Sequence, residues 1–195
     1  MSGPSEPGRS PTVRHRAVFV DRDGTLNPDL HYLADADRLE IFRGVVPGLR
    51  RLRAHGYLLV CVTNQSGVDR GFYRVEDVER IHRRLNDRLT AEGAGLDAFY
   101  YCPHAPERGC ACRKPGTLLF KTAAQELGIS FSGSAIIGDR ALDVEAGEKL
   151  GLETAIAVPP GHLASVEAEL AATGATPDIV ALSFEGAVHR LLGRG

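Results

Sequence analysis

The chain has 195 residues, a length typical of one domain with room for a small insertion. Hydrophobic residues make up 43% of it and charged residues 25%, so it can build a core and has the balance of an ordinary soluble protein. The formal net charge of −2 excludes a strong attractive field for nucleic acid, and no apolar run reaches the roughly 20 residues of a membrane span.

The start of the chain, residues 1–11, is rich in Gly, Pro and Ser and lacks the apolar core of a secretory signal. We therefore expect a disordered tail over 1–14, a single folded domain over 15–195, and a cytoplasmic location. The basic stretch over 80–84 has the spacing of a solvated helix face. We expect no nucleic-acid partner, no membrane partner and a monomer.

Short apolar runs alternate along the chain with segments of helical periodicity. The predicted strands are 17–20, 57–62, 98–101, 135–137, 154–158 and 179–182. The predicted helices are 45–55, 75–92, 117–127, 141–150, 162–172 and 185–192. This alternation predicts an α/β fold, a three-layer Rossmann-like parallel sheet with helices on both faces. The chain has no room for a large cap domain.

Polar residues stand directly after several predicted strands, where ligands bind in parallel sheets. Asp21 and Asp23 follow the first strand in FVDRDGTLN, and Gly24 permits a sharp turn. A carboxylate at the strand tip can attack phosphorus and form an aspartyl-phosphate. A second carboxylate can protonate the leaving oxygen and later activate water. A bare DxD is often only an acidic turn, but the full DxDGT after a buried strand is much more specific.

Three further motifs carry groups that bind phosphate or metal. In VTNQSG (62–67), a hydroxyl and backbone N–H groups can hold phosphate oxygens, although such a segment can also be a plain turn. In CRKP (112–115), Lys114 can neutralise charge on a phosphoryl group and on Asp21, although an Arg-Lys pair is usually solvated surface. In IIGDRALD (136–143), Asp139 is a good ligand for magnesium.

Four potential metal ligands crowd into a short segment in the pattern C-x-H-x5-C-x-C: Cys102, His104, Cys110 and Cys112. Three thiolates and one imidazole suit tetrahedral zinc, and four protein ligands leave no open position, so this zinc would be structural. The alternative is an ordinary loop with unrelated cysteines. We predict a small zinc-binding loop over 102–112, which would aim the adjacent Arg113 and Lys114.

The motifs FVDRDGTLN, VTNQSG, CRKP and IIGDRALD, taken together and in this order, resemble the haloacid dehalogenase superfamily. The resemblance covers roughly residues 17–158. The resemblance implies that Asp21 is the nucleophile and Asp23 the acid and base of a magnesium-dependent phosphatase. It implies that Asp21, the backbone carbonyl of Asp23, and Asp139 hold the magnesium. It also implies that Thr63 and Lys114 steady the phosphoryl group, which completes the predicted catalytic set.

Within the superfamily the sequence is similar to the D,D-heptose 1,7-bisphosphate phosphatases and the histidinol-phosphatases, which share DRDGT, TNQ and the cysteine cluster. By this resemblance we expect the substrate to contact DLHY (29–32), TNQS (63–66) and CRKP, where Arg113 would help to choose the substrate. Arg140, directly after Asp139, replaces a lysine of the heptose enzymes. The expected substrate contacts are Asp29, Leu30, His31, Tyr32, Thr63, Asn64, Gln65, Ser66, Arg113, Lys114 and Arg140.

Two sets of features point to different substrates. TNQSGVDRGFY (63–73) and YYCPH (100–104) favour the heptose enzymes, whereas the short gap from His104 to Cys110 and the GDR sequence at Arg140 favour histidinol-phosphatases. We predict removal of the 7-phosphate from D-glycero-D-manno-heptose 1,7-bisphosphate, with histidinol phosphate as the alternative substrate. The alternative of another class is a zinc-stabilised, non-catalytic binder of sugar phosphates.

Overall fold

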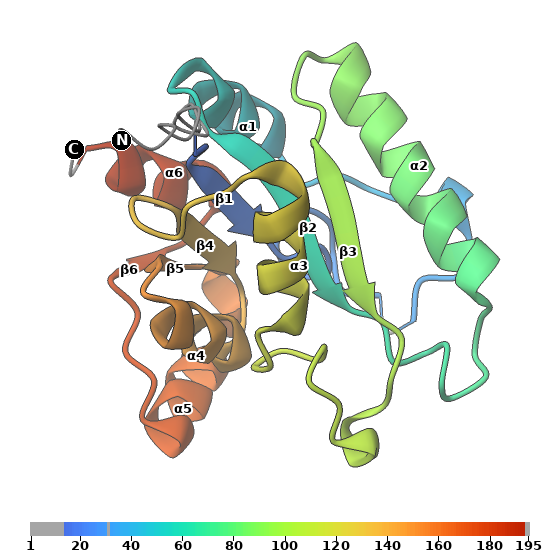
Figure 1. Ribbon diagram of the computed structural model, residues 1–195. Helices are drawn as coiled ribbons and strands as arrows, with labels where there is room; N and C mark the ends of the chain where they lie inside the picture. The colour runs from blue at the N-terminus through green and yellow to red at the C-terminus, as the bar shows by residue number, and fades with distance from the viewer. Residues whose placement is uncertain (1–13, 31, 194–195) are drawn as a thin grey trace, which may run out of the picture.

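The computed structural model describes residues 14–30 and 32–193 (Figure 1). Its centre is a sheet of six parallel strands in the order β3-β2-β1-β4-β5-β6. The strands are β1 (Ala17–Val20), β2 (Leu58–Asn64), β3 (Ala98–Cys102), β4 (Ala135–Gly138), β5 (Glu153–Ala157) and β6 (Ile179–Ala181). Because β1 lies between β2 and β4, the chain reverses its direction across the sheet at β1, and the carboxyl ends of these three strands meet there.

In the described residues, five α-helices connect successive strands and a sixth follows the last strand. They are α1 (Val45–Ala54), α2 (Val75–Ala91), α3 (Leu118–Leu127), α4 (Ala141–Leu150), α5 (Leu163–Thr173) and α6 (Phe184–Leu192). Three short 3-10 helices, which the sequence did not predict, are η1 (Ala36–Arg38), η2 (Pro106–Arg108) and η3 (Pro160–His162). The predicted strands and helices are confirmed, with ends that differ by two residues at most.

Alternate side chains of each buried strand enter opposite layers of the core. Val18 and Val20 of β1 pack with α1, α2 and α6 on one face of the sheet. Ala17 and Phe19 pack with α3 and α4 on the other face, where α5 also lies over β5 (Figure 1). All four side chains are fully buried, which explains why β1 is a continuous apolar run. The predicted three-layer α/β fold is therefore confirmed.

The two longest connections, 21–44 and 103–117, leave the carboxyl ends of β1 and β3. They are loops with a single 3-10 helix each, so no large cap domain is inserted there, as the sequence predicts. The tail predicted over 1–14 lies outside the described residues except for Arg14. None of the helices in the described part of the chain has the length and hydropathy of a transmembrane segment.

Candidate active site

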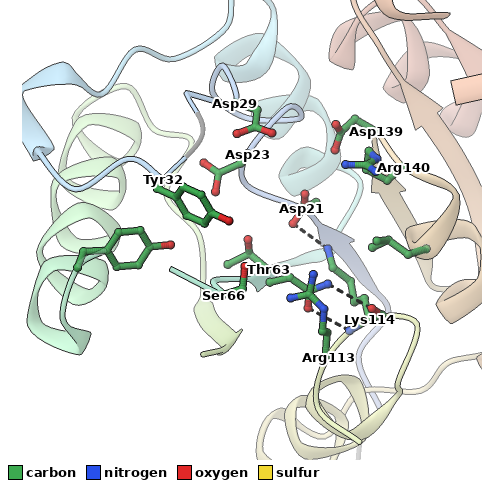
Figure 2. A pocket seen from close by; sticks show the side chains of 13 residues that line it. Asp21, Asp23, Asp29, Tyr32, Thr63, Ser66, Arg113, Lys114, Asp139 and Arg140 are labelled. Atoms are coloured by element: carbon green, nitrogen blue, oxygen red, sulfur yellow. Dashed lines mark hydrogen bonds and ion pairs between the residues drawn. The ribbon is translucent and has the colours of Figure 1, made fainter. Parts of the chain in front are cut away.

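A cavity of about 340 Å³ lies at the carboxyl ends of β1, β2 and β4 (Figure 2). Most of the predicted site residues line it: Asp21, Asp23, Asp29, Tyr32, Thr63, Asn64, Ser66, Arg113, Lys114, Asp139 and Arg140. Leu30 and the buried Gln65 do not line it, and His31 lies outside the described residues. Tyr73 and Leu142 also line the cavity, although the sequence did not single them out.

Lys114 reaches the base of the cavity and joins two carboxylates. Its Nζ lies 2.7 Å from Oδ1 of Asp21 and 2.6 Å from Oδ1 of Asp143, and it donates to the carbonyl oxygen of Val62 at 2.7 Å. The lysine side chain is only 1% exposed. A buried ammonium is costly to desolvate, so these three oxygens are what hold its charge at the site.

Asp143 is a site residue that the sequence analysis missed. Its carboxylate is buried, contacts Lys114, and accepts a hydrogen bond from the backbone N–H of Arg140 at 3.2 Å, which caps α4. Gly138 is required beside it, because a Cβ on this glycine would lie 2.2 Å from Cγ of Asp143. The one available signal was a second aspartate, four residues after Asp139, in the first turn of the following helix.

Three carboxylates converge at this end of the cavity. Oxygens of Asp21, Asp139 and Asp143 lie within 4.8 Å of one another. Burial, together with the negative charge of Asp143, raises the pKa of Asp21 to about 6 against the opposing effect of Lys114. Burial and the charge of Asp21 likewise raise the pKa of Asp139 well above its usual value. One lysine does not offset three carboxylates, so this oxygen-rich group suits a hard divalent cation.

The glycine of the DxDGT motif permits the close approach of β1 and β4. Gly24 has φ = 85°, and a Cβ on it would lie 2.1 Å from Oδ2 of Asp139. The next residue, Thr25, donates from Oγ1 to Oδ1 of Asp139 at 3.2 Å. Gly24 therefore supplies the turn, and Thr25 orients the carboxylate of the neighbouring strand end.

Asp23 lies beside the same cavity with a carboxylate that accepts several hydrogen bonds. Asn27 donates to its Oδ1 at 2.9 Å and Gln65 to its Oδ2 at 2.8 Å. Arg22 donates to both oxygens, at 3.0 and 2.5 Å. Burial alone would raise the pKa of Asp23, but the charge of Arg22 and these hydrogen bonds lower it below its ordinary value.

The amides of the TNQS segment support other site residues. Asn64 accepts from the backbone N–H of Lys114 at 3.0 Å and donates to its carbonyl oxygen at 3.2 Å, so it fixes the backbone of the CRKP segment at Lys114. Gln65, which is 1% exposed, donates to Oγ1 of Thr63 at 3.0 Å as well as to Asp23. Gln65 thus stands behind the cavity wall, whereas Thr63 and Ser66 line the cavity (Figure 2).

The rim of the cavity combines aromatic and cationic side chains. Tyr32, which has φ = 70°, lies with its ring centroid 4.4 Å from that of the exposed Phe72. Arg113 donates to the carbonyl oxygen of His104 at 3.2 Å and faces the cavity (Figure 2). Arg140 on the opposite side pairs with Glu169 of α5 through two contacts of 2.9 and 2.8 Å. This pairing ties Arg140 to the surface of α5, so Arg113 is the better placed cation for a second anionic group.

The four ligands predicted for zinc gather at one point. Sγ of Cys112 lies 3.2 Å from Sγ of Cys102, 3.3 Å from Sγ of Cys110 and 3.2 Å from Nδ1 of His104. Sγ of Cys102 lies 3.5 Å from that of Cys110. Bonds of about 2.3 Å from zinc to sulfur imply sulfur–sulfur separations not far above these values, so the donor set and its compact shape fit tetrahedral zinc.

The loop that carries the four predicted zinc ligands is attached to TNQS and to the segment that follows it. Asp69 accepts from Nε and Nη2 of Arg108, each at 2.9 Å, and from the backbone N–H of Ala105 at 3.0 Å. The backbone N–H of Gln65 donates to the carbonyl oxygen of Cys102 at 2.7 Å. These contacts join the two segments that supply Ser66 and Arg113 to the cavity lining.

The raised pKa of Asp21 predicts a pH-dependent difference in stability between the wild type and Asp21→Asn. The folded state binds the Asp21 proton more tightly than the unfolded chain, whose aspartate has a pKa near 3.8. The wild type should therefore lose stability relative to Asp21→Asn as the pH rises from about 4 to about 6, by up to about 3 kcal/mol, with no further change above. Urea unfolding of both proteins without magnesium measures this difference, and a difference that is flat with pH would contradict it.

The chain is similar in sequence to a known hydrolase family and to named phosphatases. Residues 111–187 match a family model described as HAD-hydrolase-like. A Thermoplasma acidophilum protein named probable D-glycero-D-manno-heptose-1,7-bisphosphate 7-phosphatase is 41% identical over 138 residues, which are 70% of this chain and 86% of that protein. The D-glycero-beta-D-manno-heptose-1,7-bisphosphate 7-phosphatase of Haemophilus ducreyi is 38% identical over 161 residues, 79% of this chain and 88% of that protein.

Solved structures resemble the chain along most of its length. The D,D-heptose 1,7-bisphosphate phosphatase from B. bronchiseptica, complexed with magnesium and phosphate, has a TM-score of 0.79 and 26% identity, over 92% of this chain and 99% of that chain. A putative HAD-like phosphatase from Mesorhizobium loti has a TM-score of 0.69 and 27% identity, over 88% of this chain and 93% of that chain. The likeness therefore covers about nine tenths of the chain.

Proposed function

This chain belongs to the haloacid dehalogenase superfamily of hydrolases, among the relatives of the heptose-bisphosphate 7-phosphatases, and from this membership we propose that it removes the 7-phosphate from D-glycero-D-manno-heptose 1,7-bisphosphate. The observation that carries the proposal is the position of Asp21. This carboxylate lies at a strand end, faces the cavity, and is held by the buried ammonium of Lys114 at 2.7 Å. A small cavity without a cap domain suits a small phosphorylated metabolite.

The proposed reaction has two halves. In the first, the Asp21 carboxylate attacks phosphorus, the bond to the sugar oxygen breaks, and Asp23 gives that oxygen its proton. In the second, Asp23 takes a proton from water, the water oxygen attacks the aspartyl-phosphate, and inorganic phosphate leaves with Asp21 restored. Oδ1 of Asp21 is the oxygen bonded to Lys114, so Oδ2 is the nucleophile that we propose. Thr63 and Lys114 hold the phosphoryl oxygens during both halves of the reaction and stabilise their negative charge.

We propose that magnesium binds between Asp21, Asp139 and the backbone carbonyl of Asp23. The support is the group of buried carboxylates, in which burial and the neighbouring negative charges raise the pKa values of Asp21 and Asp139. Asp143 lies in the same group, but both of its oxygens have partners, Lys114 at Oδ1 and the backbone N–H of Arg140 at Oδ2. When bound, the ion would neutralise phosphoryl oxygens and lower the repulsion between the anionic phosphate and the Asp21 nucleophile.

The regiochemistry of hydrolysis tests the proposed substrate. Incubation with D-glycero-D-manno-heptose 1,7-bisphosphate and magnesium should yield the 1-phosphate and inorganic phosphate, which phosphorus NMR resolves. Arg113→Ala should lower kcat/KM for the bisphosphate by roughly ten- to a hundredfold, because a lost charge-assisted hydrogen bond costs about 1.5–3 kcal/mol. A simple monophosphate should suffer less.

The same assay tests the alternative functions. A strong preference of the wild type for histidinol phosphate would contradict the proposed heptose substrate. Equal losses of kcat/KM on both esters in Arg113→Ala would contradict the role of Arg113 at the second phosphate. A protein that binds the bisphosphate without turning it over would be the non-catalytic binder. We further expect a monomer that works in the cytoplasm, without a nucleic-acid or membrane partner.

We propose that Cys102, His104, Cys110 and Cys112 hold one structural zinc ion per chain. Cys110→Ser should lose this zinc and unfold at a lower temperature, because a structural zinc site contributes directly to folding free energy. Elemental analysis and thermal unfolding measure both effects. Cys61→Ala, at a buried cysteine outside the cluster, is the matched control and should keep its zinc. A wild type that folds to the same stability without zinc would contradict the proposal.

A further inference from the structure

Arg22, the residue between Asp21 and Asp23, has a side chain that is only 1% exposed. Every polar atom of its guanidinium group has a partner. Nε and Nη2 contact the two carboxylate oxygens of Asp23, Nη2 also donates to Oε1 of Gln65 at 3.0 Å, and Nη1 lies 3.3 Å from Nε2 of His82. A buried guanidinium is costly to desolvate, and nothing in the proposed chemistry uses it directly, since Arg22 does not line the cavity.

His82 supplies the last partner of the Arg22 guanidinium group. It lies on α2, is 6% exposed, and stacks on Phe99 of β3 with ring centroids 4.8 Å apart. Burial lowers the pKa of His82 to about 3, and the charge of Arg22 lowers it in the same direction, so the ring is neutral. Because a guanidinium only donates, Nε2 of His82 is the acceptor of this hydrogen bond and Nδ1 carries the proton.

Gln65 is held in one orientation by the same network. Its Oε1 accepts from Arg22 and from the hydroxyl of Tyr73 at 2.9 Å, so its amide nitrogen must point the other way. That nitrogen donates to Asp23 and to Thr63. The Arg22 contact therefore sets the position of the Asp23 carboxylate both directly and through Gln65.

We propose that Arg22 and His82 are positioning residues that hold the Asp23 carboxyl group in the plane from which it exchanges its proton with the substrate oxygen. The proposal rests on the proposed function, in which Asp23 is the acid and base. Two parallel bonds from one guanidinium fix the plane of a carboxyl group, and charge-assisted bonds are roughly twice as strong as neutral ones.

Leaving-group dependence distinguishes this role from a merely structural one. A sugar alkoxide is a poor leaving group and needs the proton from Asp23, whereas 4-nitrophenolate leaves without it. The ratio kcat/KM reports the steps up to the first irreversible one, which here is cleavage of the ester. A variant that misplaces Asp23 should therefore lose kcat/KM for the heptose bisphosphate and keep it for 4-nitrophenyl phosphate.

The experiment compares both esters in the wild type, Arg22→Met, Arg22→Lys, His82→Leu and His82→Gln, with Asp23→Asn as the reference. Since general acid catalysis contributes about 10²–10⁴-fold, Arg22→Met should lower kcat/KM for the heptose ester by about a hundredfold and for the aryl ester by less than about fivefold. His82→Leu should follow the same pattern more weakly. Arg22→Lys and His82→Gln, which keep a cation and an acceptor, should recover part of the loss.

Leu85→Ala is the control, because this buried residue lies one turn from His82 on the same helix and, being aliphatic, makes no hydrogen bond to the network. It should lower the unfolding temperature and leave the ratio between the two esters unchanged. If Arg22→Met does not fold, His82→Leu decides. Equal losses on both esters, or no loss where Asp23→Asn shows one, would overturn the proposal. A wild type without turnover, or an Asp23→Asn variant with full turnover, would instead overturn the proposed function.

Discussion

Asp21→Asn should lower kcat for a phosphomonoester by at least about four powers of ten while the protein remains folded, since each power of ten corresponds to about 1.4 kcal/mol of barrier. Asparagine has nearly the shape of aspartate, but its amide is a very poor nucleophile, so the covalent route is lost. Asp21 is 8% exposed and bonded to Lys114, and the amide oxygen can keep that hydrogen bond. Steady-state kinetics and circular dichroism measure turnover and fold.

The matched control makes the same chemical change on the surface. Asp87→Asn, on the exposed face of α2, should leave turnover unchanged. Asp23→Asn should also be strongly impaired, and it should accumulate a phosphorylated protein, because water then lacks its base. Turnover near the wild-type rate by a pure, folded Asp21→Asn protein would remove Asp21 as the nucleophile.

Lys114→Met should combine a large loss of activity with a large loss of stability. Removing the lysine leaves the carboxylates of Asp21 and Asp143 buried without the cation that holds them at 2.7 and 2.6 Å. Breaking a buried ion pair from one side typically costs about 3–5 kcal/mol. The activity should fall by about a thousandfold or more, because one preorganised charge at the reacting group is commonly worth that much. Urea unfolding and steady-state kinetics give both numbers.

The pH dependence of the stability loss in Lys114→Met separates the loss of the buried ion pairs from a simple loss of packing. The orphaned carboxylates are neutral when protonated, so the stability lost in Lys114→Met should shrink as the pH falls from 7 toward 4. Lys121→Met replaces an exposed lysine of α3 and should change neither stability nor activity. A Lys114→Met protein with wild-type stability at pH 7 would show that the buried pair contributes nothing.

Much of the fold follows from patterns in neighbouring residues. The run over β1 is apolar on consecutive positions because Ala17 and Phe19 enter one core layer while Val18 and Val20 enter the other. Gly128 and Gly151, which end α3 and α4 with φ near 65°, are readable as helix ends because glycine adopts this backbone conformation without strain. The three 3-10 helices were not predictable, since a segment of three residues carries no periodic signal.

The juxtaposed strand-end carboxylates and the cluster of cysteines and histidine were also readable from the sequence. Asp21 and Asp139 follow predicted strands, and parallel strands bring their carboxyl ends to one edge of the sheet. The four predicted zinc ligands lie within eleven consecutive residues, so their spacing alone implies that they can meet. Gln65 was expected to contact the substrate, but it does not line the cavity, whereas Asn64 does. A motif identifies a segment and does not show which of its side chains face the cavity.

Local sequence patterns specify the order of the layers, the edge that carries the polar residues, and the residues that lie next to one another in a motif. The folded chain was needed to show that Asp143 meets Lys114, that Glu169 engages Arg140, and that His82 supports Arg22. Arg22 and His82 are 60 positions apart and meet because α2 packs on the sheet, where His82 stacks on Phe99 of β3. An apolar period specifies which face of a helix is buried, but a polar contact across the core depends on the rotation and height of that helix, which the packing of all its neighbours sets together.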